Sequence, residues 1–88
     1  MTTWDSVKRK TNLAKHRVDL ALAEEFDFQH AVVLEDRDVA HEQRFRAIGF
    51  IGSRLYFLVF TFGPHDEPHA ISLRPATPKE KRRYAEEL

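Results

Sequence analysis

The chain contains no cysteine, so it has neither a disulfide framework nor thiol chemistry. Its longest apolar run, residues 55–60, is far too short to cross a bilayer, and no apolar stretch follows a basic N-terminal segment. The sequence also lacks a Gly-rich phosphate loop and a nucleophile elbow. We therefore expect a protein without a membrane span or signal peptide, and its composition suits a reducing cytoplasm.

What the chain does contain is charge of both signs in separate blocks. Its 88 residues include 14 basic and 14 acidic side chains, so the net charge is zero. The segment 8–17 is basic, the segment 19–42 is acidic, and the balance is basic again from Arg44 onward. Separate blocks create local potentials that a net charge conceals, so a polyanion would meet the basic parts and a basic protein the acidic part. The length and the 42% hydrophobic content predict one globular domain, residues 1–88.

Two apolar runs in the second half predict a β-hairpin. Arg44–Ile51 and Arg54–Phe62 are separated by Gly52-Ser53, and a Gly-X pair between apolar runs is typical of a type II′ turn. That turn sets Ile51 opposite Arg54, and hence Ile48 opposite Phe57. A third run, residues 70–74, is expected to pair with the second strand.

Alternation along these strands predicts two different faces. The core face is expected to carry Phe45, Ala47, Leu58, Phe60 and Phe62. If the third strand places Ile71 and Leu73 on this face as well, Ser72 and Arg74 fall on the other. The opposite face would carry Arg44, Arg46, Ile48, Phe57, Val59, Thr61, Ser72 and Arg74, with Glu42 if the strand extends that far. Three arginines and two hydroxyls over an apolar floor suit a polyanion. The alternative, in which Arg44 and Arg46 are edge-strand charges that discourage aggregation, stays open.

Capping signals predict helices at both ends of the chain. Asp5 or Ser6 begins a helix that ends near His16-Arg17, and Asp19 begins a second one that runs to about residue 28. Residues 2–5 and 31–34 are short strand candidates.

The clearest boundary is a capping box near the C-terminus. Thr77 is the N-cap, Pro78 the first helical residue and Glu80 the third, so a basic helix is expected to run to about residue 87. The predicted fold class is therefore α+β, an antiparallel sheet with two N-terminal helices and this C-terminal helix on one side.

Short motifs, in order along almost the whole chain, resemble those of the BrnT toxins. The matching positions are Trp4-Asp5, Asn12, Lys15-His16 and Val18, then Phe26, then Glu42, Arg44 and Gly49, then Leu58-Val59-Phe60-Thr61, and finally Ile71-Ser72-Leu73-Arg74, Ala76-Thr77, Glu80 and Tyr84. Two positions depart from the family pattern. Arg17 replaces a glycine, which would cost about 1 kcal/mol in a left-handed cap. Pro75 stands where many relatives have a basic residue, which would remove one phosphate contact.

The resemblance implies a RelE-like fold and a type II toxin that inhibits translation as a ribonuclease. It further implies neutralisation by a BrnA-like antitoxin, whose ribbon-helix-helix domain binds operator DNA, so the toxin would reach that DNA only through the antitoxin. Two other functions stay open: a non-catalytic module that binds RNA or a partner, and a corepressor that completes an antitoxin–DNA complex.

Metal-independent RNA cleavage requires a base, a phosphate clamp and an acid. The candidate catalytic residues are His16, Glu42, Arg44 and Arg74. The arginines suit a phosphate clamp, whereas His16 and Glu42 compete for the role of base. The candidate substrate-binding residues are Lys15, Arg46, Ser72, Lys79, Arg82 and Tyr84. A structural role for His16 and a packing role for Tyr84 stay open.

We expect neither a metal nor a cofactor. His65 and His69 are four residues apart, but Pro68 prevents the helix that would bring them to one face. A solvated loop is the expected structure of this segment.

Overall fold

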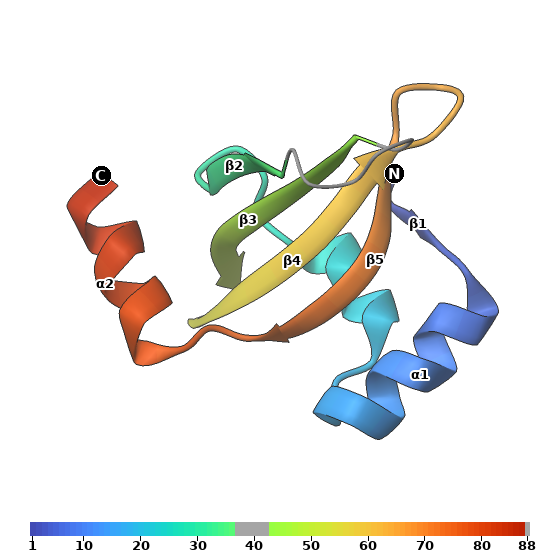
Figure 1. Ribbon diagram of the computed structural model, residues 1–88, viewed down its shortest axis with the longest axis horizontal. Coiled ribbons are helices and arrows are strands. Elements are labelled where there is room, and N and C mark those ends of the chain that lie inside the picture. The colour runs from blue at the N-terminus through green and yellow to red at the C-terminus, as the bar shows by residue number, and fades with distance from the viewer. Residues whose placement is uncertain (37–42, 88) are drawn as a thin grey trace.

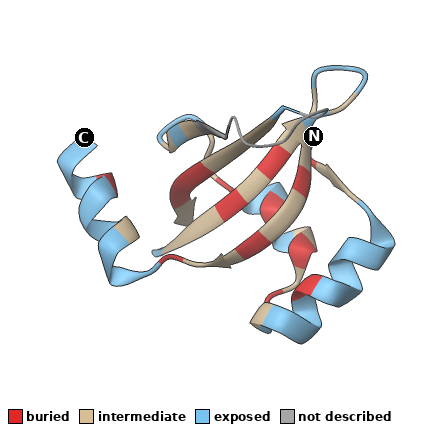
Figure 2. Ribbon diagram, in the orientation of Figure 1, coloured by how far each residue is buried: buried red, intermediate tan, exposed pale blue. Residues whose placement is uncertain are grey.

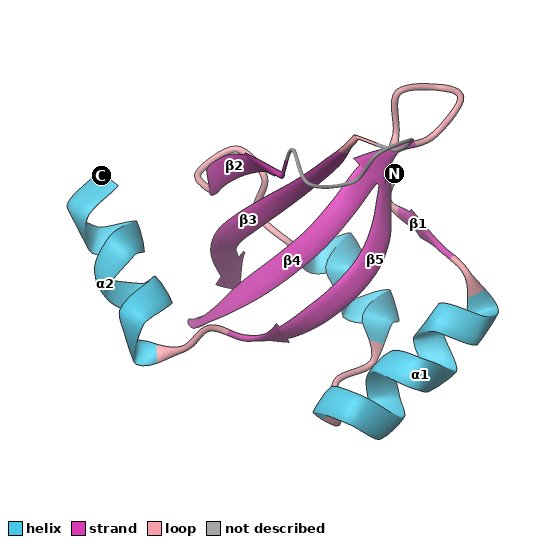
Figure 3. Ribbon diagram, viewed as in Figure 1, coloured by secondary structure: helices cyan, strands magenta, loops and turns pink. Residues whose placement is uncertain are grey.

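A five-stranded sheet organises the protein (Figures 1 and 3). The computed structural model describes residues 1–36 and 43–87. Its elements are β1 (Thr3–Trp4), α1 (Ser6–His16), the 3₁₀ helix η1 (Leu20–Glu25), β2 (Val32–Asp36), β3 (Arg44–Ile51), β4 (Arg54–Phe62), β5 (Pro68–Pro75) and α2 (Pro78–Glu87). The strand order is β1-β5-β4-β3-β2. The α+β prediction is confirmed.

The β3–β4 hairpin has the register that the sequence predicts. Ile51 pairs with Arg54 and Ile48 with Phe57. Gly52 has φ +60°, and Ser53 keeps a negative φ, as the first and second central residues of a type II′ turn require. A short local signal was sufficient here because the turn and the alternation of side chains specify the same register.

The pairing of β5 differs from the prediction in one respect. Val59 pairs with Ser72 but Phe60 pairs with Ala70, so Ile71 is the extra residue of a β-bulge. The bulge places Ala70, not Ile71, beside Leu73 in the core, where both are fully buried. The prediction of Ile71 as a core residue was therefore wrong.

The sheet is antiparallel except at one edge. β2 to β5 are antiparallel, whereas β1 pairs with β5 in parallel, through Thr3 with His69 and Trp4 with Ala70. A purely antiparallel sheet was therefore wrong for β1. β1 lies at the start of the chain and β5 near its end, and local sequence patterns do not specify a pairing between strands so far apart.

The helices do not all pack on one face of the sheet, which corrects the prediction: η1 lies behind it, and α2 stands beside its other end (Figures 1 and 2). Leu20, Ala23 and Phe26, in and just after η1, pack with the inner residues of β3, β4 and β5. On the other face Tyr84 of α2 packs with Ile48. The physical reason is that the face with the arginines also carries apolar residues, and burying them against α2 removes their surface from water.

The second predicted helix is shorter than expected. Asp19 caps it as predicted, accepting from the backbone N–H of Ala21, but the element is a 3₁₀ helix that ends at Glu25. Phe26 is extended and lies against β3 at Gly49, where a Cβ atom would be 2.7 Å from Phe26 Cζ. The close approach of this ring to the sheet ends the helix earlier than its sequence pattern alone would.

Candidate functional site

The arginine-bearing face of the sheet has the composition that the alternation predicts. One row across β5, β4 and β3 consists of Ser72, Val59 and Arg46, and the next of Arg74, Phe57 and Ile48. Ile48 is covered by α2, while the polar members of both rows stay partly exposed. Residues distant in the sequence therefore form one polar surface over an apolar floor.

Arg74 is held in place by three neighbours. Its Nη1 and Nη2 donate to the two carboxylate oxygens of Glu80, each over 2.8 Å, and Nη1 also donates to the carbonyl of Pro75. The guanidinium carbon lies 4.3 Å from the centre of the Phe57 ring. This bidentate pair joins the sheet to α2, because Glu80 belongs to the first turn of that helix.

These contacts leave one edge of the guanidinium available. An arginine has five N–H donors in a planar arrangement. Glu80 and Pro75 take both hydrogens of Nη1 and one of Nη2, and the described residues offer no acceptor to the other two. Those two, on Nε and Nη2, share one edge of the plane, and such an edge binds a phosphate or a carboxylate through two parallel hydrogen bonds.

The Glu80 carboxylate binds both Arg74 and Thr77, the N-cap residue of α2. Its Oε1 accepts from the backbone N–H of Thr77, and the Thr77 hydroxyl accepts from the N–H of Glu80, which completes the predicted capping box. The hydrogen bonds from Arg74 are the main cause that lowers the pKa of Glu80 below its usual value. The start of α2 and the position of Arg74 therefore depend on the same carboxylate.

His16 is the last residue of α1, and it is near enough to Arg74 to sense its charge. The pKa of His16 is lowered from its usual value by burial first, and then by the positive charges of Lys15 and Arg74. Its imidazole is therefore mostly neutral at pH 7, the form that accepts a proton.

Two features of α1 place His16 there. The buried Asn12 donates to the carbonyls of Val18 and Leu73 and accepts from the N–H of Leu73, all within 2.9 Å. Arg17 then ends the helix in a left-handed conformation, φ 58°, with its N–H bonded to the carbonyl of Leu13. Asn12 thus fastens α1 to β5 one turn before His16.

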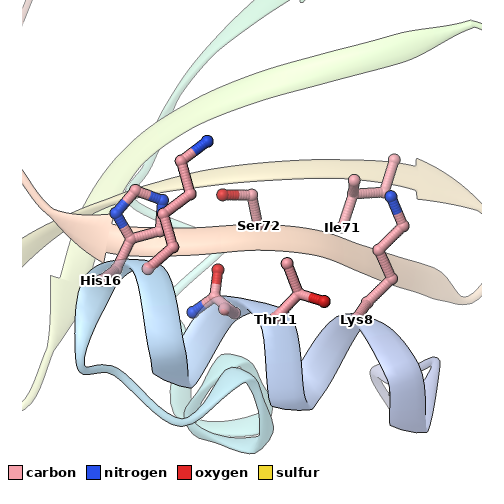
Figure 4. A pocket seen from close by; sticks show the side chains of 7 residues that line it. Lys8, Thr11, His16, Ile71 and Ser72 are labelled. Carbon is pink, nitrogen blue, oxygen red and sulfur yellow. The ribbon is translucent and has the colours of Figure 1, made fainter.

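A hollow lies on either side of this surface. The first, of about 150 Å³, lies between α1 and β5, with Lys15, His16 and Ser72 in its lining (Figure 4). The second, of about 250 Å³, lies between the sheet and α2. Arg46, Lys79 and Arg83 line the second, and Arg46 Nε is buried there without a hydrogen-bond partner among the described residues.

A comparison of the sequence with protein-family models identifies the family of this chain. Residues 4–80 match the family model described as "Ribonuclease toxin, BrnT, of type II toxin-antitoxin system". The chain belongs to the BrnT family.

A solved structure supports the same family membership. The chain is similar to the Brucella abortus ribonuclease toxin BrnT, known from a 1.1 Å crystal structure, at 32% sequence identity and a TM-score of 0.66. The match covers 88% of this chain and 97% of that one. The comparison with curated sequences gives no match. Membership of a toxin–antitoxin family implies an antitoxin partner for this chain.

The structure places five of the site residues predicted for this BrnT chain in the two hollows. Lys15, His16 and Ser72 line the first hollow, and Arg46 and Lys79 the second. Arg44 lies on the same strand as Arg46, and Arg74 on the same strand as Ser72. Glu42 falls outside the described residues.

Two further predicted residues, Tyr84 and Arg82, line neither of these two hollows. Tyr84 is 6% exposed, packs on Phe50 and donates its hydroxyl hydrogen to the carbonyl of His30. It has the packing role, so its prediction as a base-stacking residue was wrong. Arg82 lies on an exposed part of α2 and does not line the second hollow, whereas its neighbour Arg83 does.

Four residues of the site were missed from the sequence. Glu80 was recognised only as a cap, although its place six residues after Arg74 was a usable signal. Asn12 was recognised only as part of a motif. Lys8 and Arg83 had no signal, because the face of a helix that meets the sheet depends on tertiary packing.

Two negative findings concern the described residues. They include no group of three or more His, Cys, Asp or Glu side chains placed to hold a metal ion. Within residues 1–36 and 43–87, no helix combines the length and apolar character needed to span a membrane.

Proposed function

We propose that the chain is a RelE-like, metal-independent endoribonuclease that inhibits translation by cutting RNA. Two observations support this most strongly: the described residues leave one edge of the Arg74 guanidinium without an acceptor, and His16 is near enough for the charge of Arg74 to lower its pKa. A fixed guanidinium fork suits a phosphate diester, and a neutral imidazole suits the removal of a proton from a neighbouring hydroxyl.

In the proposed reaction, His16 takes the proton of the ribose 2′-OH, and the 2′ oxygen attacks phosphorus. The bond from phosphorus to the 5′ oxygen breaks, and the leaving oxygen takes a proton from water. The products are a 2′,3′-cyclic phosphate and a 5′-hydroxyl. Arg74 binds the non-bridging oxygens, where negative charge increases in the transition state. Arg44, which lies two strands away and further along β3, would bind another phosphate of the same RNA strand. Glu42 is the alternative base.

The remaining cations would bind the strand on both sides of the cleaved bond. Lys15 and Ser72 border His16, whereas Arg46, Lys79 and Arg83 line the hollow next to α2. In that hollow Leu34, Ile48 and Phe57 supply an apolar floor on which a base can rest. Arg82 would add charge from the outer side of α2.

We further propose that the antitoxin partner is BrnA-like. Its ribbon-helix-helix domain would carry the complex to operator DNA, with no direct contact between this chain and that DNA. The acidic segment before Arg44 suits a basic surface on that partner.

The test uses purified protein, free of antitoxin, with a long unstructured RNA in EDTA. Wild type is compared with Arg74→Ala and Arg74→Lys. Lysine keeps the charge but loses the fork, so we expect kcat/KM to fall about 100-fold in both variants. Arg54→Ala is the matched control, because Arg54 lies over the Tyr56 ring on the face of the sheet opposite to Phe57 and Arg74.

The chemical groups at the new RNA ends test the proposed reaction. New 3′ ends bearing 2′,3′-cyclic phosphate, lost with Arg74 but not with Arg54, support the proposal. If the wild type cuts neither free RNA nor mRNA on translating ribosomes, or if Arg74→Ala cuts as fast as wild type, the proposal is wrong.

A further inference from the structure

The hollow between α1 and β5 continues well beyond His16. Figure 4 shows His16 and Lys8 at opposite ends of it, with Thr11 between them on α1 and Ser72 and Ile71 above on β5. Lys8 precedes His16 by eight residues, which is about 12 Å along a helix. Lys8 is therefore too far from His16 to share one phosphate with it.

The charge of this hollow is not balanced from within. It is lined by Lys8, Lys15 and His16 and by no carboxylate. Neither lysine makes an ion pair among the described residues, whereas Arg9 of the same helix pairs with Asp19 at 2.8 Å. The positive charges of Lys8 and Lys15 are therefore not neutralised by an ion pair within the described residues.

One hydroxyl of the hollow is available as a donor. The Thr11 hydroxyl already donates to the carbonyl of Val7, and the Asn12 amide is fully used by Val18 and Leu73. The Ser72 hydroxyl makes no hydrogen bond within the described residues. Ser72 and Lys8 therefore offer free donors from opposite walls.

The β-bulge shapes the wall on the side of the sheet. In a regular strand, consecutive side chains point to opposite faces, so only one of Ile71 and Ser72 would border the hollow. Because Ile71 is the extra residue of the bulge, both border it. The wall thus combines an apolar group, suited to a ribose, with a hydroxyl suited to a phosphate oxygen. The volume, about 150 Å³, corresponds to about five water molecules.

We propose that this hollow is a second phosphate subsite, in which Lys8 binds the backbone phosphate of a nucleotide next to the cleaved bond and the hydroxyl of Ser72, which lies between Lys8 and His16, donates to the same RNA strand. The inference rests on the proposed ribonuclease function and adds the path of the strand, which runs along α1. Lys15 lies between the two phosphates and contributes to both.

The first experiment measures binding without cleavage. The probe is a 2′-O-methyl oligoribonucleotide, whose blocked 2′ oxygen cannot attack phosphorus, and its Kd is measured at several salt concentrations. We expect Lys8→Gln to raise Kd about five-fold and to reduce the slope of log Kd against log salt by about 0.7. Lys10→Gln is the matched control, because Lys10 belongs to the same helix but does not line the hollow.

The second experiment locates the phosphate. The substrate is a deoxyoligonucleotide with one ribonucleotide, so that cleavage occurs at one bond, and a methylphosphonate replaces one neighbouring phosphate at a time. At one neighbouring position the neutral linkage should slow wild type about five-fold and leave Lys8→Gln unaffected, because the lost contact is the same.

The outcomes separate this inference from the proposed function. Equal Kd values for Lys8→Gln and Lys10→Gln, or additive losses at every methylphosphonate position, would overturn the subsite. A probe that binds in a Lys8-dependent way to a protein that cuts no RNA would keep the subsite and refute the nuclease.

Discussion

The contact between Arg74 and Glu80 makes a testable prediction about how α2 is held. The change is Glu80→Gln, which removes the charge and one of the two oxygens that Arg74 binds. The remaining amide oxygen can still accept from the N–H of Thr77, so the capping box loses little. The variant therefore isolates the ion pair from the cap.

Burial sets the expected magnitude. The side chains of Arg74 and Glu80 are 30% and 18% exposed, and their two hydrogen bonds are 2.8 Å long. Exposed ion pairs contribute at most about 1 kcal/mol, and hydrogen bonds to charged groups about 1.5–3 kcal/mol. We expect Glu80→Gln to lower the free energy of unfolding by about 1.5 kcal/mol, and hence Tm by roughly 9 °C for a chain of this size.

The assay is urea unfolding in a double-mutant cycle of Glu80→Gln, Arg74→Gln and both together. The cycle should give a coupling energy above about 1 kcal/mol, because each change removes the same contact. A coupling energy below about 0.3 kcal/mol would refute the conclusion that this pair fastens α2 to the sheet.

The dependence on pH supplies an independent check. The pKa of Glu80 is lower in the folded protein than its usual 4.5, so the unfolded chain takes up the proton first. The contribution of the pair is therefore complete above about pH 4.5 and is lost as the pH falls through the folded pKa. The difference in stability between wild type and Glu80→Gln should shrink over that range. A difference that stayed constant down to pH 3 would contradict the assignment.

Three further predictions concern α1. Asn12→Ala should lower the free energy of unfolding by roughly 3 kcal/mol in urea titration, because it leaves buried backbone groups of Leu73 without partners; a loss below 1 kcal/mol would show that water replaces the amide. Arg17→Gly should raise stability by about 0.5–1 kcal/mol, because glycine has no penalty at φ 58°; a loss of stability would indicate a contact of the Arg17 side chain. If His16 is the base, kcat/KM should rise with pH through a midpoint below 6.5, since its pKa is lowered; an unchanged acidic limb in His16→Gln would assign the base elsewhere.

Much of the sheet was predictable because its signals are local. Gly52 and the alternation of β3 and β4 specify the same register, so the polar face with Arg46 and Arg74 follows from the amino-acid sequence alone. The capping box at Thr77 and Glu80 is equally local, since both partners lie within one turn. The resemblance of the motifs to the BrnT family could likewise be recognised from the sequence.

What only the tertiary structure decided involves residues far apart in the chain. The bulge at Ile71 depends on how β5 meets β4, and it changes which side chains enter the core and which border the hollow beside α1. Asn12 bonds to a strand 61 residues away. Short-range propensities cannot specify such contacts, because they depend on which apolar surfaces the whole chain buries together.

The position of α2 on the sheet also depends on contacts between residues far apart in the chain. Its few apolar residues gave no indication of a firm position, yet Tyr84 is buried and Glu80 holds Arg74. The sequence by itself determined the strands, the caps and the residue types of the polar face. The tertiary structure decided which of those residues meet, because burial of Ile48 under Tyr84 brings α2 and its carboxylate to the edge of the sheet that carries Arg74.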